Sequence, residues 1–518
     1  MKNFKFFRII VSSIISVSLI IVFTDFYKVA SSWFINLSHF LQFIPSFLSF
    51  TTVISAAGTG FIFIILLTFL YGRTYCSFIC PLGFFQDIFI RLGGILFRKK
   101  GFSYSKPGYM LFYSILAVMA ISFIISGTTL LLWLDPFSIF GRFLTHTASL
   151  PLMKLNNELA GLLIKKDIFF IHSFEKNISS IAAAFSLSIF GLIMILSMFR
   201  GRYYCNRFCP VGGFLSLISR ISLFRLSIDE NSCIHCGKCE KICKSECIDH
   251  KTNYIDSGRC IACFNCLNQC PNGSISFTGF SPAPVKKKTP GSGEITRMSF
   301  LAGIILFPSL LQSKENNKTV LYYQEPLKQK QYKRKSFSSP PGSVSIDLLN
   351  SRCTACSLCI SVCPTKVLQP SVMQYGLIGI MQPFMDFNSG FCNYDCTLCG
   401  EICPTGAIRL KDLDEKKQIR TGKSVFVIEN CITYTSGTDC GACSEHCPTK
   451  AVHMVPFKNG LVIPEINSEI CTGCGACEYA CPVRPLRAIY VEGLKKHDSA
   501  KLPQVKKKEK IIEADFPF

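Results

Sequence analysis

Four long apolar stretches lie in the first half of the chain, and the remainder is mostly polar. They cover residues 9–23, 53–71, 109–134 and 178–199. Each is near the roughly 20 residues that an α-helix needs to cross the hydrocarbon core of a bilayer, and the first is the shortest. A fifth apolar run, residues 298–311, is shorter still. The pattern predicts an α-helical membrane domain of four to five spans.

Basic residues flank these stretches on alternate sides. They are Lys2, Lys5, Arg8, Arg73, Arg98, Lys99, Lys100, Lys106, Arg200 and Arg202. Loops that stay in the cytoplasm carry an excess of Lys and Arg. We therefore expect an inner (cytoplasmic) membrane protein in which the N-terminus, the 73–106 loop and the segment just after residue 200 face the cytoplasm.

Cysteine is the strongest chemical signal in the chain. There are 29 cysteines, and 24 of them fall into six quartets of nearly constant spacing. The quartets are Cys233, Cys236, Cys239 and Cys243; Cys260, Cys263, Cys266 and Cys270; Cys353, Cys356, Cys359 and Cys363; Cys392, Cys396, Cys399 and Cys403; Cys431, Cys440, Cys443 and Cys447; and Cys471, Cys474, Cys477 and Cys481. This regular spacing indicates metal binding, because disulfide scaffolds are small and irregularly spaced.

The spacing is typical of [4Fe–4S] ligands. Three closely spaced cysteines supply three thiolates to one cubane, and the fourth, usually before proline, reaches the neighbouring cluster. Zinc sites use two CxxC pairs or include His, which does not fit six such runs. The sequence therefore predicts up to six [4Fe–4S] clusters. Cys247 is the odd thiol, either a bystander or a substitute ligand.

Because quartets work in pairs, we expect Cys270 to complete the first cluster and Cys243 the second. For the four later quartets we expect nested pairing, the third with the sixth and the fourth with the fifth. Cys481 would then serve the cluster held by Cys353.

These features define five segments of the chain. We predict a four-helix transmembrane domain over residues 1–220 and a two-cluster ferredoxin-like domain over 221–280. A basic linker, 281–344, contains the apolar run 298–311. A four-cluster ferredoxin-like domain over 345–495 precedes a charged tail, 496–518. Both ferredoxin-like domains should be α+β, with short strands at 274–277, 424–428 and 488–491.

One motif occurs twice, each time where an apolar stretch ends. Gly72-Arg-Thr-Tyr-Cys76-Ser-Phe-Ile-Cys80-Pro-Leu-Gly83 returns as Gly201-Arg-Tyr-Tyr-Cys205-Asn-Arg-Phe-Cys209-Pro-Val-Gly212. Cysteines four apart share one helical face. The two pairs either form one extra four-thiol redox site, act separately as a redox pair or docking surface, or only mark helices that begin at Pro81 and Pro210.

The net charge adds little to these predictions. The formal charge is +22, yet the basic runs 286–288, 333–335 and 506–508 lack interleaved aromatic residues. Stacking aromatics are typical of single-stranded nucleic-acid sites. We expect a lipid membrane as the partner of these charges and no nucleic acid.

The chain resembles the NapH and NapG types of iron–sulfur protein, the second related to MauM, joined in one chain. Residues 1–280 resemble the membrane type through the spans, the two CxxxCP motifs and the Leu134-Asp-Pro-Phe137 segment. Residues 345–495 resemble the hydrophilic type through Cys353 to Pro364, the spacing of Cys431 and Cys440, and Cys471 to Pro482. The resemblance implies electron transfer from quinol in the quinone pool to an external redox partner, a reductase or a cytochrome.

The resemblance leaves two points open. The segment near residues 296–301 keeps one arginine of a twin-arginine export signal, so residues 312–518 lie either in the periplasm or in the cytoplasm. The chain acts either as an electron carrier or as a quinol dehydrogenase subunit. The alternatives are quinone reduction fed by ferredoxin or a cytoplasmic enzyme, and a non-catalytic maturation factor or redox sensor.

Candidates for a quinol site lie near the predicted outer ends of the spans. They are His39, Asp135, Arg142 and His146. Anchoring at the membrane interface is the alternative role for each of them.

Overall fold

The computed structural model describes residues 3–25, 31–53, 56–98, 101–167, 172–173, 179–279, 329–410 and 412–503. The segments Met1–Phe280 and Lys330–Phe518 belong to one compact unit. The apolar run predicted at residues 298–311 lies outside the described residues.

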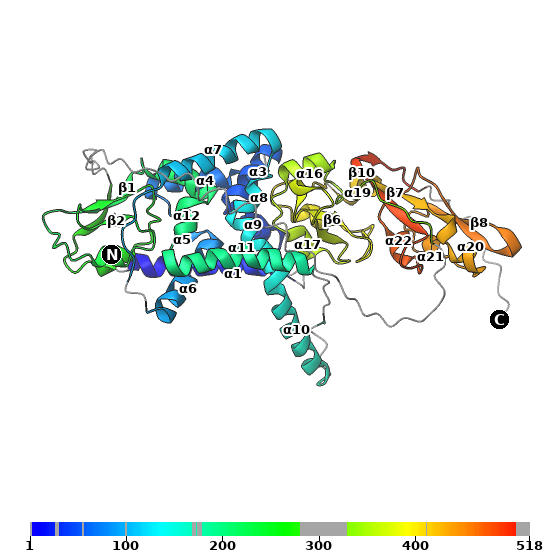
Figure 1. The fold of residues 1–518 in the computed structure, drawn as a ribbon, viewed down its shortest axis with the longest axis horizontal. Coiled ribbons are helices and arrows are strands. Elements are labelled where there is room, and N and C mark those ends of the chain that lie inside the picture. Colours follow the sequence, from blue (N-terminus) through cyan, green and yellow to red (C-terminus); the bar gives the residue numbers. More distant parts are fainter. Residues whose placement is uncertain are drawn as a thin grey trace, which may run out of the picture. The chain divides into compact units, whose positions relative to one another are not determined.

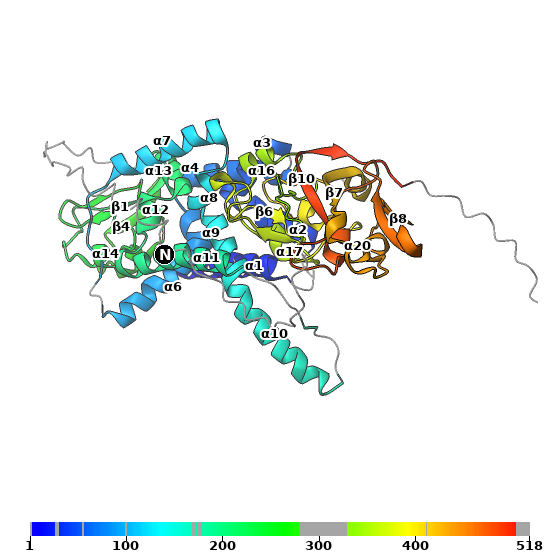
Figure 2. The ribbon, with the colours of Figure 1, turned by 45° about the vertical axis from the view of Figure 1, so that its right-hand side comes forward.

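The first half of the chain is a helical bundle (Figure 1). Its helices are α1 (Asn3–Thr24), α2 (Ser32–Phe40), α3 (Phe43–Val53), α4 (Gly60–Tyr71), α5 (Tyr75–Phe78), α6 (Pro81–Leu96), α7 (Tyr109–Ser126), α8 (Leu131–Leu134), α9 (Pro136–Phe143), α10 (Ser149–Ile164), α11 (Ser180–Arg200), α12 (Tyr203–Arg207) and α13 (Pro210–Ser219), with the short helical segments η1 (Ala56–Thr59) and η2 (Leu144–Ala148). Helix α10 projects away from the other helices in both ribbon views (Figures 1 and 2).

Three helices among the described residues are long and apolar enough to cross a membrane: Phe4–Thr24, Tyr109–Ser126 and Ser180–Arg200. The third expected span is therefore shorter than predicted, because the chain turns at Gly127, which has a φ of 69°. The second expected span is the 12-residue helix α4, which rises only about 18 Å. The chain is a membrane protein with at least these three spanning candidates.

Two helices, α6 and α13, begin inside the bundle. Phe85 of α6 packs against Phe190 near the middle of α11, whereas Phe97 at the far end of α6 packs against Phe199 near the end of α11. Helix α6 thus runs parallel to α11, and its Pro81 end is level with the interior of that helix. Helix α13 contacts α4 and α7 and likewise starts at a proline, Pro210.

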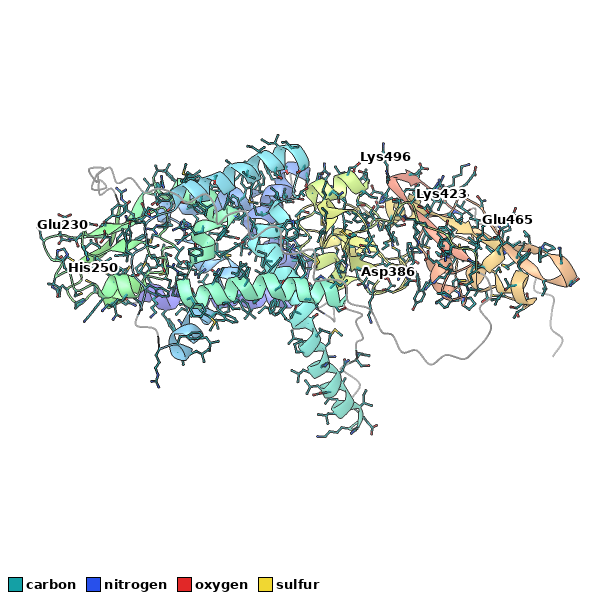
Figure 3. All side chains as sticks on the ribbon, in the orientation of Figure 1. Glu230, His250, Asp386, Lys423, Glu465 and Lys496 are labelled. Carbon is teal, nitrogen blue, oxygen red and sulfur yellow. The ribbon has the colours of Figure 1, made fainter. Side chains whose placement is uncertain are left out.

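The first ferredoxin-like domain is a small α+β fold. Strands β1 (Phe224–Ile228) and β4 (Ile275–Gly279) pair antiparallel, as do β2 (Ile248–Asp249) and β3 (Tyr254–Ile255). Two short helices, α14 (Lys238–Lys241) and α15 (Asn265–Gln269), lie between them. His250, labelled in Figure 3, forms an ion pair with Glu240 of α14. The strand predicted at 274–277 is β4.

The second cysteine-rich region contains three antiparallel strand pairs. They are β5 (Leu368–Pro370) with β6 (Pro383–Met385), β7 (Ile419–Phe426) with β10 (Ile489–Ser499), and β8 (Val452–Pro456) with β9 (Val462–Ile466). The short helices are α16 (Ile346–Arg352), α17 (Leu358–Val362), α18 (Leu398–Glu401), α19 (Leu413–Gln418), α20 (Ile432–Ser436), α21 (Ala442–Glu445) and α22 (Ala476–Ala480), with η3 (Leu377–Gly379), η4 (Ile428–Asn430) and η5 (Lys458–Gly460). The strands predicted at 424–428 and 488–491 correspond to β7 and β10.

This region extends further toward the N-terminus than the cysteine pattern indicates. Tyr332 stacks on Tyr490 with ring centroids 3.9 Å apart. Arg334 forms an ion pair with the buried carboxylate of Glu478. Residues from about 330 onward, which the sequence assigns to a linker, therefore pack with the second ferredoxin-like domain.

The two ferredoxin-like regions contact opposite ends of α1. At its start, Phe4 packs against Phe264 of the first domain, with ring centroids 5.5 Å apart. At its end, Phe23 belongs to an apolar cluster that includes Cys356 and Leu358 of the second. With 22 residues, α1 is about 33 Å long. The helical bundle therefore lies between the two groups of cysteines.

Candidate iron–sulfur sites

The regularly spaced quartets share one loop conformation. In the Cys353–Cys359 loop, Ala355 and Ser357 on either side of Cys356 have φ values of 53° and 67°. Gly473 and Gly475 flank Cys474 in the same way, with φ values of 74° and 80°. This left-handed backbone turns peptide N–H groups inward, and Ala355 N–H donates to the Cys353 thiol at 3.3 Å. Hydrogen bonds of this kind tune cluster potentials.

In the first domain, the structure places Cys243 beside Cys263 and Cys266. This arrangement matches the assignment of Cys243 to the second cluster. Cys239 lies beside Cys233 and Cys236 of its own quartet. Cys270 packs against the same apolar cluster of residues as Cys239.

Cys247 is buried beside the second set of ligands. Its sulfur lies 3.5 Å from that of Cys243, and it also bonds with Cys260. The repeat explains its position, because Val367, Ala407 and Ala451 stand four residues after Cys363, Cys403 and Cys447 and are equally buried. Cys247 thus occupies a packing position that its counterparts fill with small apolar side chains.

The nested pairing expected for the last four quartets is wrong. Cys403 lies beside Cys353, Cys356 and Cys359, so the third quartet pairs with the fourth. Cys363 accordingly lies beside Cys392 and Cys399.

The fifth quartet pairs with the sixth. Cys481 lies beside Cys443, and Cys447 lies beside Cys474 and Cys477. Strands β7 and β10 enclose the loops of the fifth and sixth quartets, and the β5–β6 hairpin connects those of the third and fourth. Sequence spacing does not reveal that enclosure.

The two halves of the C-terminal region meet through their cysteine loops. The backbone N–H of Cys392 donates to the carbonyl of Cys474 at 2.9 Å. The cysteine sets therefore follow one another in a definite order. The cysteines grouped with Cys353 face the bundle, and those grouped with Cys392 follow them. The cysteines grouped with Cys474 come next, and those grouped with Cys443 come last.

The two CxxxCP motifs meet inside the bundle. Cys209 lies beside Cys76, Cys80 and Cys205, and all four thiols are at most 6% exposed. Cys80 and Cys209 are the N-cap residues of α6 and α13, which begin at Pro81 and Pro210. The Cys209 thiol accepts a hydrogen bond from Gly212 N–H at 3.4 Å. Four buried thiols thus share one site at two helix N-termini.

Each motif is held by the arginine of the other. Arg73 donates to the carbonyl of Cys205 at 2.9 Å, and Arg202 donates to that of Cys76 at 3.2 Å. A Cβ on Gly212 would lie 2.7 Å from the Arg73 guanidinium, and one on Gly83 would lie 2.5 Å from that of Arg202. This exchange explains why each motif contains a Gly-Arg pair before its cysteines and a glycine after them.

The thiol sites fit iron–sulfur clusters better than single metal ions. Among the described residues, no group of three or more His, Cys, Asp or Glu side chains is arranged to hold one ion. A cubane carries its thiolates on four different iron atoms, so its ligands stand further apart. Burial raises the pKa of Cys239 to about 11 and that of Cys443 to about 12, so these thiols need a cationic metal to ionise.

Buried cations accompany the thiols. Arg73 and Arg202 are fully buried at the four-thiol site. Arg142 is buried beside Cys353 and Cys356, and within the described part of the chain neither terminal nitrogen of its guanidinium has a hydrogen-bond partner. An unpaired buried cation is costly. Anionic thiolate clusters would compensate the charges of Arg73 and Arg142, whereas Arg202 also pairs with Asp87.

The other three residues predicted near the outer ends of the spans differ from Arg142 in their contacts. Asp135 caps α9 through bonds from Phe137 and Ser138 N–H, which is a structural role. His146 lies 3.0 Å from the Ser357 hydroxyl, inside the third cysteine loop. His39 is buried on α2 and lines a cavity beside Cys403. Sequence patterns did not indicate that Gly141 touches the Cys356 carbonyl, because that contact joins distant segments.

Comparison with protein families agrees with these sites. A family described as a 4Fe-4S binding domain matches residues 55–100 and 182–229, the two segments that carry the CxxxCP motifs. A 4Fe-4S dicluster domain matches residues 391–451 and 436–484. No solved structure matches the chain.

Three curated relatives come from bacteria. The putative electron transport protein YccM of Escherichia coli is 25% identical over 47% of this chain and 61% of its own length. The methylamine utilization ferredoxin-type protein MauN of Methylobacillus flagellatus is 25% identical over 45% and 72%. The ferredoxin-type protein NapH of Haemophilus influenzae is 23% identical over 44% and 68%.

The helical bundle and the cysteine sites together define a membrane iron–sulfur electron-transfer protein of the ferredoxin type. Within that class, the chain is similar to the NapH and MauN types.

Proposed function

We propose that the protein conducts electrons along a chain of [4Fe–4S] clusters, from quinol in the membrane to a redox partner. The observation that carries this proposal is the four-thiol site of Cys76, Cys80, Cys205 and Cys209. It is buried in the bundle, between ferredoxin-like regions that contact opposite ends of α1. When bound, clusters accept and release electrons singly.

Six clusters are assigned to the quartets, and the four-thiol site is an additional redox centre. Arg73 supports an electron-transfer link between the four-thiol site and the first ferredoxin-like domain. It donates hydrogen bonds to Asn206 at 2.8 Å and to the Gly258 carbonyl at 3.0 Å. On the other side, the Tyr204 hydroxyl donates to the Leu134 carbonyl at 2.6 Å, immediately before the start of α9. Helix α9 then contacts the Cys353 loop through Gly141.

Topology follows from the charged end of the bundle. Arg8, Arg202 and Lys244 all bind Asp87, at 2.8, 2.7 and 2.7 Å. This cationic end faces the cytoplasm by the positive-inside rule. The first ferredoxin-like domain is then cytoplasmic, and residues 330–503 are periplasmic, where they deliver electrons to a reductase or a cytochrome.

One observation favours a second function, in which electrons flow the other way. The first cysteine pair lies in a domain at the cationic end of the bundle, and Cys236 is exposed. A soluble ferredoxin or a cytoplasmic enzyme can reach such a site, and the electrons would then reduce quinone.

The test is anaerobic mixing of the intact protein in detergent with a menaquinol analogue, while the broad visible iron–sulfur absorbance is followed. We expect rapid bleaching, and a variant without residues 330–518 should lose most of its amplitude. No bleaching by quinol, with rapid bleaching by reduced ferredoxin, would replace the proposal with the reverse flow.

A further inference from the structure

A cavity opens where α2 and α3 meet the fourth cysteine quartet. Its volume is about 720 Å³, within the range of small-molecule sites. Trp33, Leu37 and Phe40 of α2 supply an apolar wall, and Cys403 and Pro404 lie opposite. Thr52 at the end of α3 fixes this face by donating to the Thr405 carbonyl at 3.1 Å. The cavity therefore reaches a cysteine ligand directly from the membrane bundle.

The apolar wall continues onto the lipid-facing surface. Trp33 is 71% exposed and Leu37 is 40% exposed. Tryptophan is enriched where a membrane meets water. A ligand with a long hydrocarbon tail can thus enter from the bilayer and leave its tail there.

His39 is a buried polar residue in the wall of the cavity. Its side chain is 6% exposed, and its Nε2 has no hydrogen-bond partner among the described residues. A buried polar atom without a partner costs free energy, on the order of 1–3 kcal/mol. A ligand hydroxyl in the cavity would remove that cost.

From this geometry we propose that the cavity is the quinol site, with a quinol hydroxyl hydrogen-bonded to His39 Nε2 and the ring beside Cys403. The inference rests on the proposed function, which requires quinol but does not locate it. It assigns electron entry to the cluster held by Cys353, Cys356, Cys359 and Cys403.

The chemistry balances with these groups. Oxidation of one quinol to quinone releases two protons and two electrons. His39 accepts the proton of the hydroxyl that it binds, and the second proton leaves to water at the open face of the cavity. Cys353, Cys356, Cys359 and Cys403 would hold a [4Fe–4S] cluster, which when bound would accept these electrons one at a time. His39 binds and orients the substrate and holds one proton.

Binding is measured with a heptyl hydroxyquinoline N-oxide, a fluorescent quinol analogue, added to the cluster-loaded full-length protein in detergent. Quenching of its emission reports binding without turnover. We expect saturable quenching for the wild type and at least tenfold weaker binding for His39→Leu. Asn36→Trp should weaken binding equally, because Asn36 is an exposed residue that lines the cavity and a large ring there fills it without disturbing the core.

The matched control is His146→Gln. His146 lies on η2 and contacts Ser357 of the third cysteine loop, but it is not among the residues that line the cavity. This variant should bind the analogue as the wild type does. Three results would overturn the assignment. The first is wild-type affinity in both cavity variants, the second is equal weakening of binding in His146→Gln, and the third is no saturable quenching in the wild type.

The outcomes distinguish a failure of the proposed quinol site from a failure of the proposed function. If the cavity variants bind normally while quinol still bleaches the clusters, quinol binds elsewhere and electron transfer stands. If the analogue binds as expected but quinol reduces no cluster, the cavity remains the assigned binding site and the proposal of outward electron transfer is wrong.

Discussion

Arg142 shows how single residues adjust this protein to its clusters. It is 1% exposed, it lies beside Cys353 and Cys356, and its terminal nitrogens are unpaired among the described residues. A fixed positive charge stabilises the more negative, reduced form of a neighbouring cluster. Arg142 therefore raises the potential of the cluster that faces the bundle.

Replacing Arg142 with Gln should lower that potential by about 60 mV or more, since about 1.4 kcal/mol of lost attraction corresponds to 59 mV for one electron. Redox titration followed by electron paramagnetic resonance measures the shift. Lys501→Gln removes an exposed cation that pairs with Glu469, and it should leave every potential in place. An unchanged potential in Arg142→Gln would contradict this role.

His497 makes the second ferredoxin-like domain sensitive to acid. Burial lowers its pKa from 6.5 to about 4, and its Nε2 lies 2.8 Å from the Ser339 hydroxyl. The unfolded chain binds a proton at this residue below about pH 6.5, whereas the folded chain does so only near pH 4. The stability contributed by neutral His497 is therefore complete above pH 6.5 and is lost as the pH falls toward 4.

We expect His497→Gln to remove up to about 2 kcal/mol of this pH dependence. Denaturant unfolding of the cluster-loaded protein at pH 7 and pH 5 measures it. His453→Gln is the control, because His453 is half exposed on β8, paired with Glu465, which is labelled in Figure 3. Equal pH dependence in wild type and His497→Gln would refute the assignment.

At the scale of elements, the sequence predicts local structure well and pairings less well. The CxxCxxC spacing and the short strands were predictable, because each depends on neighbouring residues. The pairing of quartets was not, because it depends on strands such as β7 and β10 that join residues 419–426 to 489–499. The end of α7 at Ser126 was missed because the apolar residues 130–134 continue the hydrophobic run beyond Gly127.

The corrected pairing has a direct test. Cys481→Ser should abolish the cluster held by Cys431, Cys440 and Cys443, because Cys481 lies beside Cys443. The cluster held by Cys353 should remain. Iron content should fall by four atoms per chain at most, and Mössbauer or paramagnetic resonance spectra should identify the missing cluster. Loss of the Cys353 cluster would restore the nested arrangement.

The crossed arginines predict a specific role for the glycines of α6 and α13. Gly83→Ala should disrupt the four-thiol site, since the added Cβ would stand 2.5 Å from both the Arg202 guanidinium and the Cys76 carbonyl. Gly94→Ala on the same helix meets nothing within 4 Å and serves as the control. We expect loss of one redox centre in the first variant and none in the second, measured by iron content and redox titration. Full iron content with an unaltered titration in Gly83→Ala would show that this contact is not needed.

At the scale of the whole molecule, two cysteine-rich domains and a membrane bundle form one compact unit. The repeated motif predicts a shared site for the two cysteine pairs only as one of several alternatives. Only the fold shows that α6 and α13 begin inside the bundle and bring the four thiols together. Nor could the sequence fix which end of the bundle the C-terminal domain contacts, because that contact joins α1 and α9 to residues beyond 350.

The central claim is that the four-thiol site links the clusters of the two ferredoxin-like regions through the bundle. The most direct measurement uses sealed vesicles that contain the protein and a trapped, membrane-impermeant cytochrome, with dithionite added outside. We predict rapid reduction of the cytochrome by wild type and by Ser77→Ala, which alters a buried hydroxyl in the same turn. Cys205→Ser should abolish the crossing while the clusters of the quartets remain loaded. Equal rates in Cys205→Ser and wild type would contradict the account.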